Sequence, residues 1–167
     1  MSALPEPRIR HAHPADAAAW IAMRLALWPD ELEAVHAAEV ARFFTAPGAS
    51  SGVLPEAVLV AAIPAEPAER LIGFAELSRR AYAEGCATSP VGFLEGWYVA
   101  PEYRRRGAGR ALVAAAEVWA RSQGCREFAS DTPLENAVGA VAHQALGFEE
   151  VGVLRCFRKN LDSEAAP

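Results

Sequence analysis

The chain has 167 residues, of which 52% are hydrophobic, and a formal net charge of −5 at pH 7. This length predicts a single domain, residues 1–167, with one hydrophobic core. The net negative charge argues against a protein that binds nucleic acids in general or anionic membrane surfaces. A local cluster of basic residues can still hold a phosphorylated ligand.

The cysteines and the first residues narrow the class further. Cys86, Cys125 and Cys156 are widely spaced without a Cys-x-x-Cys pair, so we expect neither a disulfide framework nor a zinc site, but buried free thiols. His11 and His13 are too weak a pair to predict a metal, and none is expected. The N-terminal residues lack the apolar core of a signal peptide, and no apolar run approaches the ~18 residues of a membrane span. We therefore expect a soluble cytoplasmic protein.

The first half of the chain predicts two short amphipathic helices and a β-hairpin. Apolar residues recur at helical spacing in two stretches, and the second begins with acidic residues that suit the helix dipole. Two apolar runs separated by a proline-containing turn form the hairpin. The expected elements are a strand at 9–11, helices at 17–27 and 31–44, a loop at 46–56, and strands at 57–63 and 70–77.

The second half predicts alternating strands and helices after a long polar loop. The loop, residues 78–92, is long for a compact domain, and loops of that kind are more often functional than idle. Gly124 and Gly147 are predicted to end two helices. The expected elements are strands at 93–99, 125–130 and 148–159, and helices at 110–122 and 136–146. The chain is thus predicted to be one α/β domain with a sheet of about six strands and about four helices.

The stretch 95–120 joins an apolar strand to a basic glycine loop and a helix. Glycine allows a close approach of the backbone to a ligand, and the free N–H groups of a first helical turn point at whatever lies before them. The helix dipole and the Arg104-Arg105-Arg106 run add positive charge. This arrangement predicts a phosphate or pyrophosphate site, since a solvated basic face would not explain the adjacent glycines. It is neither a P-loop nor a dinucleotide fingerprint.

Two carboxylates are predicted to lie in one crevice. Glu95 lies where a strand approaches the glycine loop, and Asp131 follows the neighbouring strand. Ligands bind at such strand ends in open α/β sheets, and a polyamine would form charge-assisted hydrogen bonds there. The alternative is a structural ion pair or a helix-capping Asp131.

Two motifs together resemble the GNAT N-acetyltransferase superfamily. They are Arg104-x-x-Gly107-x-Gly109 after a strand, and Asn136-x-x-Gly139-x-x-x-His143-x-x-x-Gly147-Phe148 further along. More narrowly, the chain is similar to the type I aminoglycoside 6'-N-acetyltransferases. The segments that carry this resemblance are Leu27-Trp28-Pro29, Tyr82-Ala83-Glu84-Gly85-Cys86, Ser89-Pro90-Val91, Leu94-Glu95-Gly96, Ala129-Ser130-Asp131-Thr132 and Gly147-Phe148-Glu149-Glu150.

The resemblance implies a GNAT fold with a central mixed twisted sheet, acetyl-CoA as co-substrate, a cationic aminosugar as acceptor, and a homodimer. It implies that Asn136 touches the cofactor's arm, and that Tyr82 reaches the acceptor pocket from a second subunit. The other implied cofactor-binding residues are Trp97, Tyr98, Val99, Arg105, Arg106, Gly107, Ala108, Gly109 and Arg110. The implied acceptor-binding residues are Trp28, Tyr82, Glu95 and Asp131. Some relatives carry an acidic contact where this chain has Gly152.

The chemistry assigns further roles. Only a neutral amine can attack a thioester, so Glu95 or Asp131 is predicted to take the amine proton, directly or through water, and the sequence does not choose between them. His143 is predicted to protonate the departing thiolate or, alternatively, to be a packed core or cofactor-contact residue. A backbone N–H within 97–99, freed by a bulge or splay, is the expected oxyanion donor. The alternative functions are acetylation of another small polyamine or a protein amine, and a non-catalytic CoA-binding module.

Overall fold

The computed structural model describes residues 5–45 and 54–161, which form one mixed five-stranded sheet in the order β1-β2-β3-β4-β5. The strands are β1 (Arg8–His11), β2 (Ala57–Ile63), β3 (Arg70–Arg80), β4 (Val91–Val99) and β5 (Phe128–Ser130). Neighbours from β1 to β4 are antiparallel, whereas β5 pairs parallel to β4. This is the expected α/β class with a mixed sheet.

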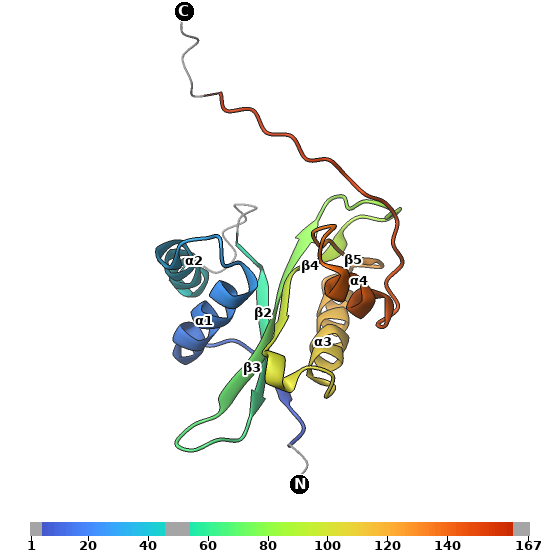
Figure 1. Ribbon diagram of the computed structural model, residues 1–167. Coiled ribbons are helices and arrows are strands. Elements are labelled where there is room, and N and C mark those ends of the chain that lie inside the picture. The colour runs from blue at the N-terminus through green and yellow to red at the C-terminus, as the bar shows by residue number, and fades with distance from the viewer. Residues whose placement is uncertain (1–4, 46–53, 162–167) are drawn as a thin grey trace, which may run out of the picture.

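Helices cover both faces of the sheet (Figure 1). One face carries α1 (Ala17–Leu27) and α2 (Glu33–Thr45), and the other carries α3 (Ala108–Ser122) and α4 (Ala137–Gln144). Two short 3-10 turns, η1 (Pro14–Asp16) and η2 (Pro101–Tyr103), precede α1 and α3. Within the described residues, no helix is long and apolar enough to cross a membrane.

The core lies in two layers that share strand β2. All seven residues of β2 are buried, as expected of a central strand with helices on both sides. Leu59 and Ala61 pack with α3, whereas Val58 and Val60 pack with Trp20 on the α1 side. The continuous apolar run of β2, rather than an alternating pattern, therefore reflects burial on both faces.

Most predicted elements are confirmed, with shifted ends. Helix α1 and strand β2 have the predicted bounds, α3 begins at Ala108 rather than Arg110, and β5 begins at Phe128 rather than Cys125. Gly124 and Gly147, with φ of 81° and 90°, follow the ends of α3 and α4. The predicted loop at 46–56 lies largely outside the described residues.

Two sequence predictions are wrong in the described chain. Residues 148–159, expected as a sixth strand, are extended but pair with no strand, because extended backbone becomes a strand only when a ladder partner is present. The segment leaves the body of the protein (Figure 1). The expectation of three buried thiols also fails, because Cys125 is buried, Cys86 is half-buried and Cys156 is exposed.

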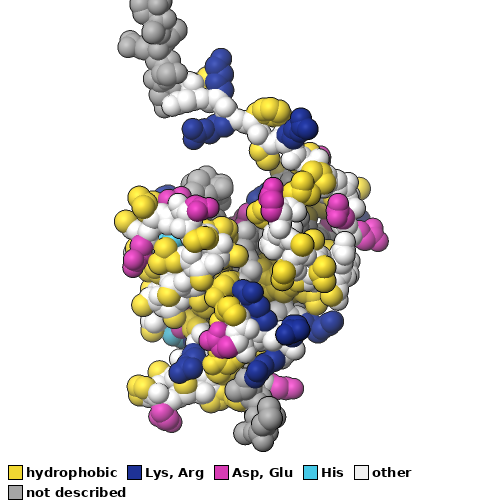
Figure 2. Space-filling model, viewed as in Figure 1, with side chains coloured by type: hydrophobic (Ala, Val, Ile, Leu, Met, Phe, Trp, Pro, Cys, Tyr) yellow, Lys and Arg dark blue, Asp and Glu magenta, His cyan; other side chains and the backbone are white. Residues whose placement is uncertain are grey.

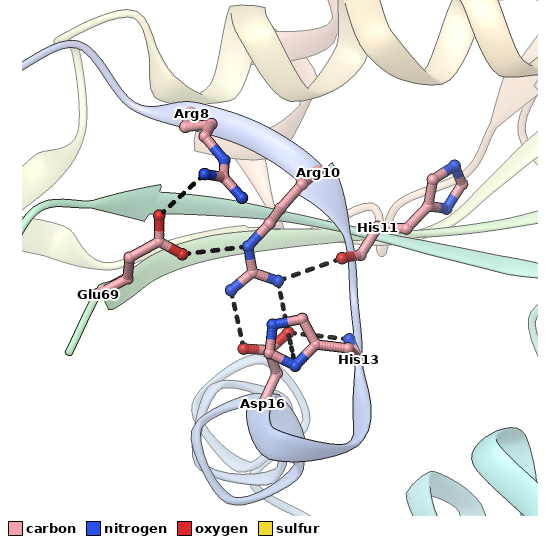
Figure 3. Close-up of polar contacts among 6 residues, drawn as sticks. All are labelled: Arg8, Arg10, His11, His13, Asp16 and Glu69. Carbon is pink, nitrogen blue, oxygen red and sulfur yellow. Dashed lines mark hydrogen bonds and ion pairs between the residues drawn. The ribbon is translucent and has the colours of Figure 1, made fainter.

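A polar cluster fixes β1 to its neighbours (Figure 3). Arg10 donates two hydrogen bonds to Asp16, at 2.6 and 3.0 Å, and a third to Glu69 at 3.2 Å. Asp16 also accepts from the His13 backbone N–H at 2.9 Å, which holds the start of η1. The cluster joins β1, the first helical turn and the hairpin end, and it explains why a buried carboxylate is tolerated there.

Candidate active site

A β-bulge in β4 sets the geometry of the site. Gly96 pairs with Glu76 and Leu94 pairs with Leu77, so Glu95 is an extra residue in β4 without a partner in β3. Leu94 packs in the α3-side core, yet Glu95 contacts Ser78 and Arg80 on the opposite face. Because a bulge interrupts the alternation of a strand, Glu95 and Gly96 both lie on the α1 side.

Trp28 packs directly on this bulge. A β-carbon at Gly96 would lie 2.5 Å from the Trp28 ring, so the absence of a side chain there makes room for the indole. The ring also stacks on His36, with centroids 6.3 Å apart, and lies within 5.1 Å of the Arg24 guanidinium carbon. Trp28, at the end of α1, thus packs on the residue next to Glu95 in β4, and both were predicted from the sequence as acceptor-binding residues.

The carboxylate of Glu95 is fully engaged within the chain. The Ser78 hydroxyl and the Arg80 Nε both donate to Oε1, the latter at 3.0 Å, and Arg80 Nη2 donates to Oε2. The Arg80 guanidinium lies over the Phe93 ring, 3.3 Å from its centroid. Glu95 is only partly buried, with 28% of its side chain exposed, so a ligand can still reach it.

A buried charged network lies behind Trp28. Glu76, 3% exposed, accepts a hydrogen bond from Trp20 Nε1 at 2.9 Å and pairs with Arg24 at 3.3 Å. Arg24 also pairs with Glu39 and donates to His36 Nδ1. Burial raises the pKa of Glu76 to about 7, and the neighbouring Arg24 opposes this rise only in part.

Strands β4 and β5 separate immediately beyond the bulge. Their pairing ends at Leu94 and Ser130, so the β5-facing edge of β4 from residue 95 onward has no strand partner in the described residues. Asp131, exposed, follows the last paired residue of β5 and thus lies beside the start of this opening. The indole N–H of Trp97 is buried without a hydrogen-bond partner among the described residues. The backbone of β4 at this edge therefore has no strand partner in the described part of the chain, whereas the Trp97 N–H is enclosed by the protein.

The basic loop before α3 has the predicted character. Arg105 and Gly107 have positive φ values of 58° and 92°, and Gly107 is the left-handed N-cap of α3. The first intrahelical bond runs from Ala111 N to Gly107 O at 2.9 Å, which leaves the N–H groups of residues 108–110 free of helical acceptors. Arg105, Arg106 and Arg110 are exposed around this helix start, and Figure 2 shows several basic side chains close together on the lower part of the face that it displays.

Three predicted cofactor residues have additional structural roles. A β-carbon at Gly109 would lie 2.8 Å from the Trp97 ring, so Gly109 serves close packing of α3 on β4. The Val99 carbonyl accepts from Arg104 Nε at 2.8 Å. Tyr98 faces the opposite side and stacks on Phe74, with centroids 6.1 Å apart.

Helix α4 places two further predicted residues. The Asn136 side chain caps α4 by accepting from Gly139 N at 2.9 Å and donates to Thr132 at 2.9 Å. His143 lies edge-on to Trp97, with centroids 5.5 Å apart. Its Nδ1 is 2.7 Å from the Gly139 carbonyl and its Nε2 is 3.0 Å from Ser130 Oγ. A carbonyl only accepts, so Nδ1 carries a hydrogen and Nε2 faces the end of β5 through Ser130.

The loop that carries Tyr82 is anchored by a residue that sequence reasoning missed. The Glu127 carboxylate accepts from the backbone N–H groups of Ala87 and Thr88, at 2.9 and 2.6 Å, and from the Thr88 hydroxyl. Hydrogen bonds from Thr88 lower the pKa of Glu127. Tyr82 itself is 66% exposed and donates to Glu84, so its place in the acceptor pocket stays a prediction.

The other residues missed from sequence lie on β3 and α1. Glu76, Ser78 and Arg80 alternate along β3 and therefore share one face, a period-two polar pattern that the sequence displays. Arg24 lies in a helix that is otherwise apolar, and only the fold reveals its buried partners Glu39 and Glu76. No cluster of three or more metal-ligating side chains occurs among the described residues.

Comparison with known proteins gives consistent results. The sequence matches the acetyltransferase (GNAT) family over residues 20–148. An aminoglycoside N(6')-acetyltransferase type 1 of Klebsiella aerogenes is 51% identical over 155 residues, which cover 93% of this chain and 97% of that protein. A protein of the same name from Stenotrophomonas maltophilia is 44% identical over 160 residues, covering 95% and 97%.

Solved structures show the same similarity in three dimensions. AAC(6')-Iy in complex with the bisubstrate analogue CoA-S-monomethyl-acetylneamine superposes with a TM-score of 0.78 at 36% identity, covering 93% of this chain and 99% of that chain. The aminoglycoside 6'-N-acetyltransferase AAC(6')-Ih of Acinetobacter baumannii has a TM-score of 0.78 at 37% identity, with the same coverage.

Proposed function

The chain belongs to the acetyltransferase (GNAT) family, and from this premise we propose that it transfers the acetyl group of acetyl-CoA to the 6'-amine of an aminoglycoside in a ternary complex. The observation that carries the proposal is the opening of β4 from β5, which lies between a basic helix start and the carboxylates Glu95 and Asp131. Acetylation removes a positive charge from the drug, and this loss of a cationic contact would confer resistance.

The residues at the donor side fit acetyl-CoA. The left-handed residues Arg105 and Gly107, the free N–H groups at the start of α3 and the exposed arginines supply positive potential for a pyrophosphate. The unpaired β4 edge at residues 97–99 offers backbone hydrogen bonds to an extended amide arm, in the manner of an added strand. Asn136, which caps α4, is proposed to contact the same arm. CoA complexes of the similar structures support this assignment.

The acceptor side is acidic and aromatic. Glu95 and Asp131 attract a polycation, and the Trp28 ring beside Glu95 offers an apolar surface to a sugar ring. The pocket is thus suited to an aminosugar rather than to an anionic or wholly apolar acceptor. Tyr82 is proposed to complete it from a second subunit.

The acceptor amine must lose a proton before it attacks. Acetyl-CoA supplies a thioester, and only an uncharged amine has the lone pair that reacts with it. Glu95 or Asp131 is proposed to accept this proton, directly or through water. Ser78 and the bulge hold Glu95 in position, which supports Glu95 for this role.

Charge develops at two further atoms during the transfer. Because β4 has separated from β5 beyond Leu94, a backbone N–H within residues 97–99 on the free edge of β4 is proposed to donate to the thioester oxygen. His143 is proposed to deliver a proton to the departing thiolate. Because Nδ1 carries the hydrogen donated to Gly139, His143 can give a proton only from Nε2 of the doubly protonated ring, and that proton passes through the Ser130 hydroxyl or requires this bond to break.

We further propose a homodimer formed through residues 149–159. This segment is extended and carries exposed apolar side chains, which is unfavourable in water. The exposed apolar residues of this segment are Val151, Val153, Leu154 and Phe157. Figure 2 shows apolar and basic side chains along the segment. The edge of β5 that does not face β4 can accept such a strand from a second copy. Light scattering of the full chain is expected to give twice the mass of one chain, and a monomer would contradict the proposal.

The test of function is thiol release from acetyl-CoA in the presence of different amines. Kanamycin-like sugars are expected to give rapid release, whereas simple polyamines and peptides are expected to react slowly. Faster reaction with polyamines or peptides would favour another acceptor. Tight CoA binding without release for any amine would favour a non-catalytic module. A cytoplasmic location and the absence of a nucleic-acid partner stay predictions.

A further inference from the structure

We propose that Arg80 is a specificity-determining residue. In the free protein its guanidinium binds the Glu95 carboxylate, and an ammonium group of the acceptor binds the same carboxylate in the complex. The inference rests on the proposed function and deepens it, because it concerns competition for the same carboxylate. A cation must displace Arg80 or share Glu95 with it. Arg80 therefore selects for acceptors with several positive charges.

The contacts of Glu95 show that Arg80 is a competitor rather than the sole support of the carboxylate. Arg80 binds both carboxylate oxygens, and 40% of its own side chain is exposed. Ser78 holds Oε1 independently, and the bulge fixes the backbone of Glu95. Removal of the guanidinium would thus leave an oriented carboxylate without its cation.

The Arg80 guanidinium also makes a second favourable contact, which does not involve Glu95. Its guanidinium carbon lies 3.3 Å from the centre of the Phe93 ring, and a cation is attracted to the face of an aromatic ring. When an ammonium group binds the Glu95 carboxylate, the Arg80 guanidinium can keep its contact with the Phe93 ring and direct its N–H donors toward water. The exchange therefore needs a side-chain movement and no change in the sheet.

The exchange affects cations with one charge more severely than cations with several charges. A monoamine that displaces Arg80 gains one ion pair and breaks another of similar strength, so its net gain is small. An aminoglycoside carries further ammonium groups that Asp131 can bind at the same time. Arg80 hence weakens the binding of all cations. Only polycations make enough other contacts to bind in spite of this competition.

The test replaces Arg80 with methionine, which keeps the length and apolar stem of the side chain. Arg80→Met is expected to lower the KM for kanamycin about three- to tenfold, and the KM for a monoamine such as glucosamine by at least as much, with an unchanged KM for acetyl-CoA. Arg79→Met is the matched control. Arg79 is the adjacent residue of β3, and it pairs with Glu56 at 2.6 Å instead. Its KM values are expected to equal those of the wild type.

A second substitution separates the inference from the proposed function. In a Glu95→Gln background, Arg80→Met is expected to leave the kanamycin KM unchanged, because no carboxylate remains to be freed. If Arg80→Met alone leaves the kanamycin KM unchanged or raises it, while Glu95→Gln raises the kanamycin KM, the inference is wrong and the proposed acceptor site is supported. If Glu95→Gln changes neither kcat nor the kanamycin KM, the acceptor site itself is wrong. Isothermal titration with kanamycin and circular dichroism of each variant exclude a folding defect as the cause.

Discussion

The Trp28 ring occupies the space that a side chain at Gly96 would fill. A β-carbon at Gly96 would lie 2.5 and 2.9 Å from two ring atoms, closer than packed carbons tolerate. The bulge turns both Glu95 and Gly96 toward this ring, so the conformation of β4 and the position of Trp28 depend on one another.

Gly96→Ala tests this dependence. The added methyl group must displace the indole, so we expect a loss of about 1–3 kcal/mol in the free energy of unfolding and a raised KM for the aminoglycoside. The KM for acetyl-CoA should change little. Urea unfolding and steady-state kinetics measure these effects. Trp28→Phe in the same chain should restore part of the stability, and the absence of any restoration would argue against the contact.

Glu95→Gln and Asp131→Asn test the proton acceptor. Replacement of the residue that takes the amine proton by its amide should lower kcat by about 100-fold or more, because an amide side chain cannot act as a base. The other residue should mainly raise the acceptor KM. Kinetics across pH identify the two roles. Wild-type rates for both variants at all pH values would rule out this mechanism.

His143→Ala tests the proton donor to the thiolate. A thiolate is a good leaving group, so we expect only a moderate fall in kcat of about tenfold, measured by steady-state kinetics. Ser130→Ala should show a fall in the same direction, since its hydroxyl contacts His143 Nε2 at 3.0 Å. Unchanged kcat with lower thermal stability would instead identify His143 as a packing residue between Trp97 and Phe148.

The buried carboxyl of Glu76 predicts a pH-dependent stability. Burial raises its pKa to about 7 in the folded state from 4.5, so between these values the folded protein binds more protons than the unfolded chain. The free energy of unfolding is thus expected to fall by about 2–3 kcal/mol as pH rises from about 5 to 8, because the contribution of Glu76 is lost. Glu76→Gln should remove this dependence in urea unfolding at several pH values. Glu117→Gln, which breaks an exposed pair with Arg121, should leave it intact.

Asp16 predicts the opposite dependence. Burial alone would raise the pKa of Asp16, but hydrogen bonds from Arg10 and His13 outweigh it and lower the pKa. Its contribution is therefore present above about pH 4 and lost as pH falls further. Asp16→Asn should cost about 1–3 kcal/mol at pH 7 and less under acid conditions. Equal cost at pH 7 and pH 3 would show that the charge is not what stabilises this cluster.

The local sequence was sufficient for most of the elements. Helical spacing of apolar residues predicted α1, and the continuous apolar run predicted β2, because these patterns depend only on which face is buried. The basic glycine loop before α3 was also predictable, since left-handed backbone at Gly107 and free N–H groups at a helix start are local properties.

Contacts between distant segments could not be read from any local pattern. The bulge at Glu95 depends on the register between β3 and β4, and the partners of Glu95 on β3 follow from that register. The network of Arg24 and Glu76 forms only when α1 packs on the sheet. The expected strand at 148–159 found no ladder partner in the described chain. The sequence by itself determined which charged side chains the chain carries and which of them stand beside a glycine loop or a strand end. The tertiary structure decided which of them meet, because strand register and helix packing set the distances between groups far apart in the chain.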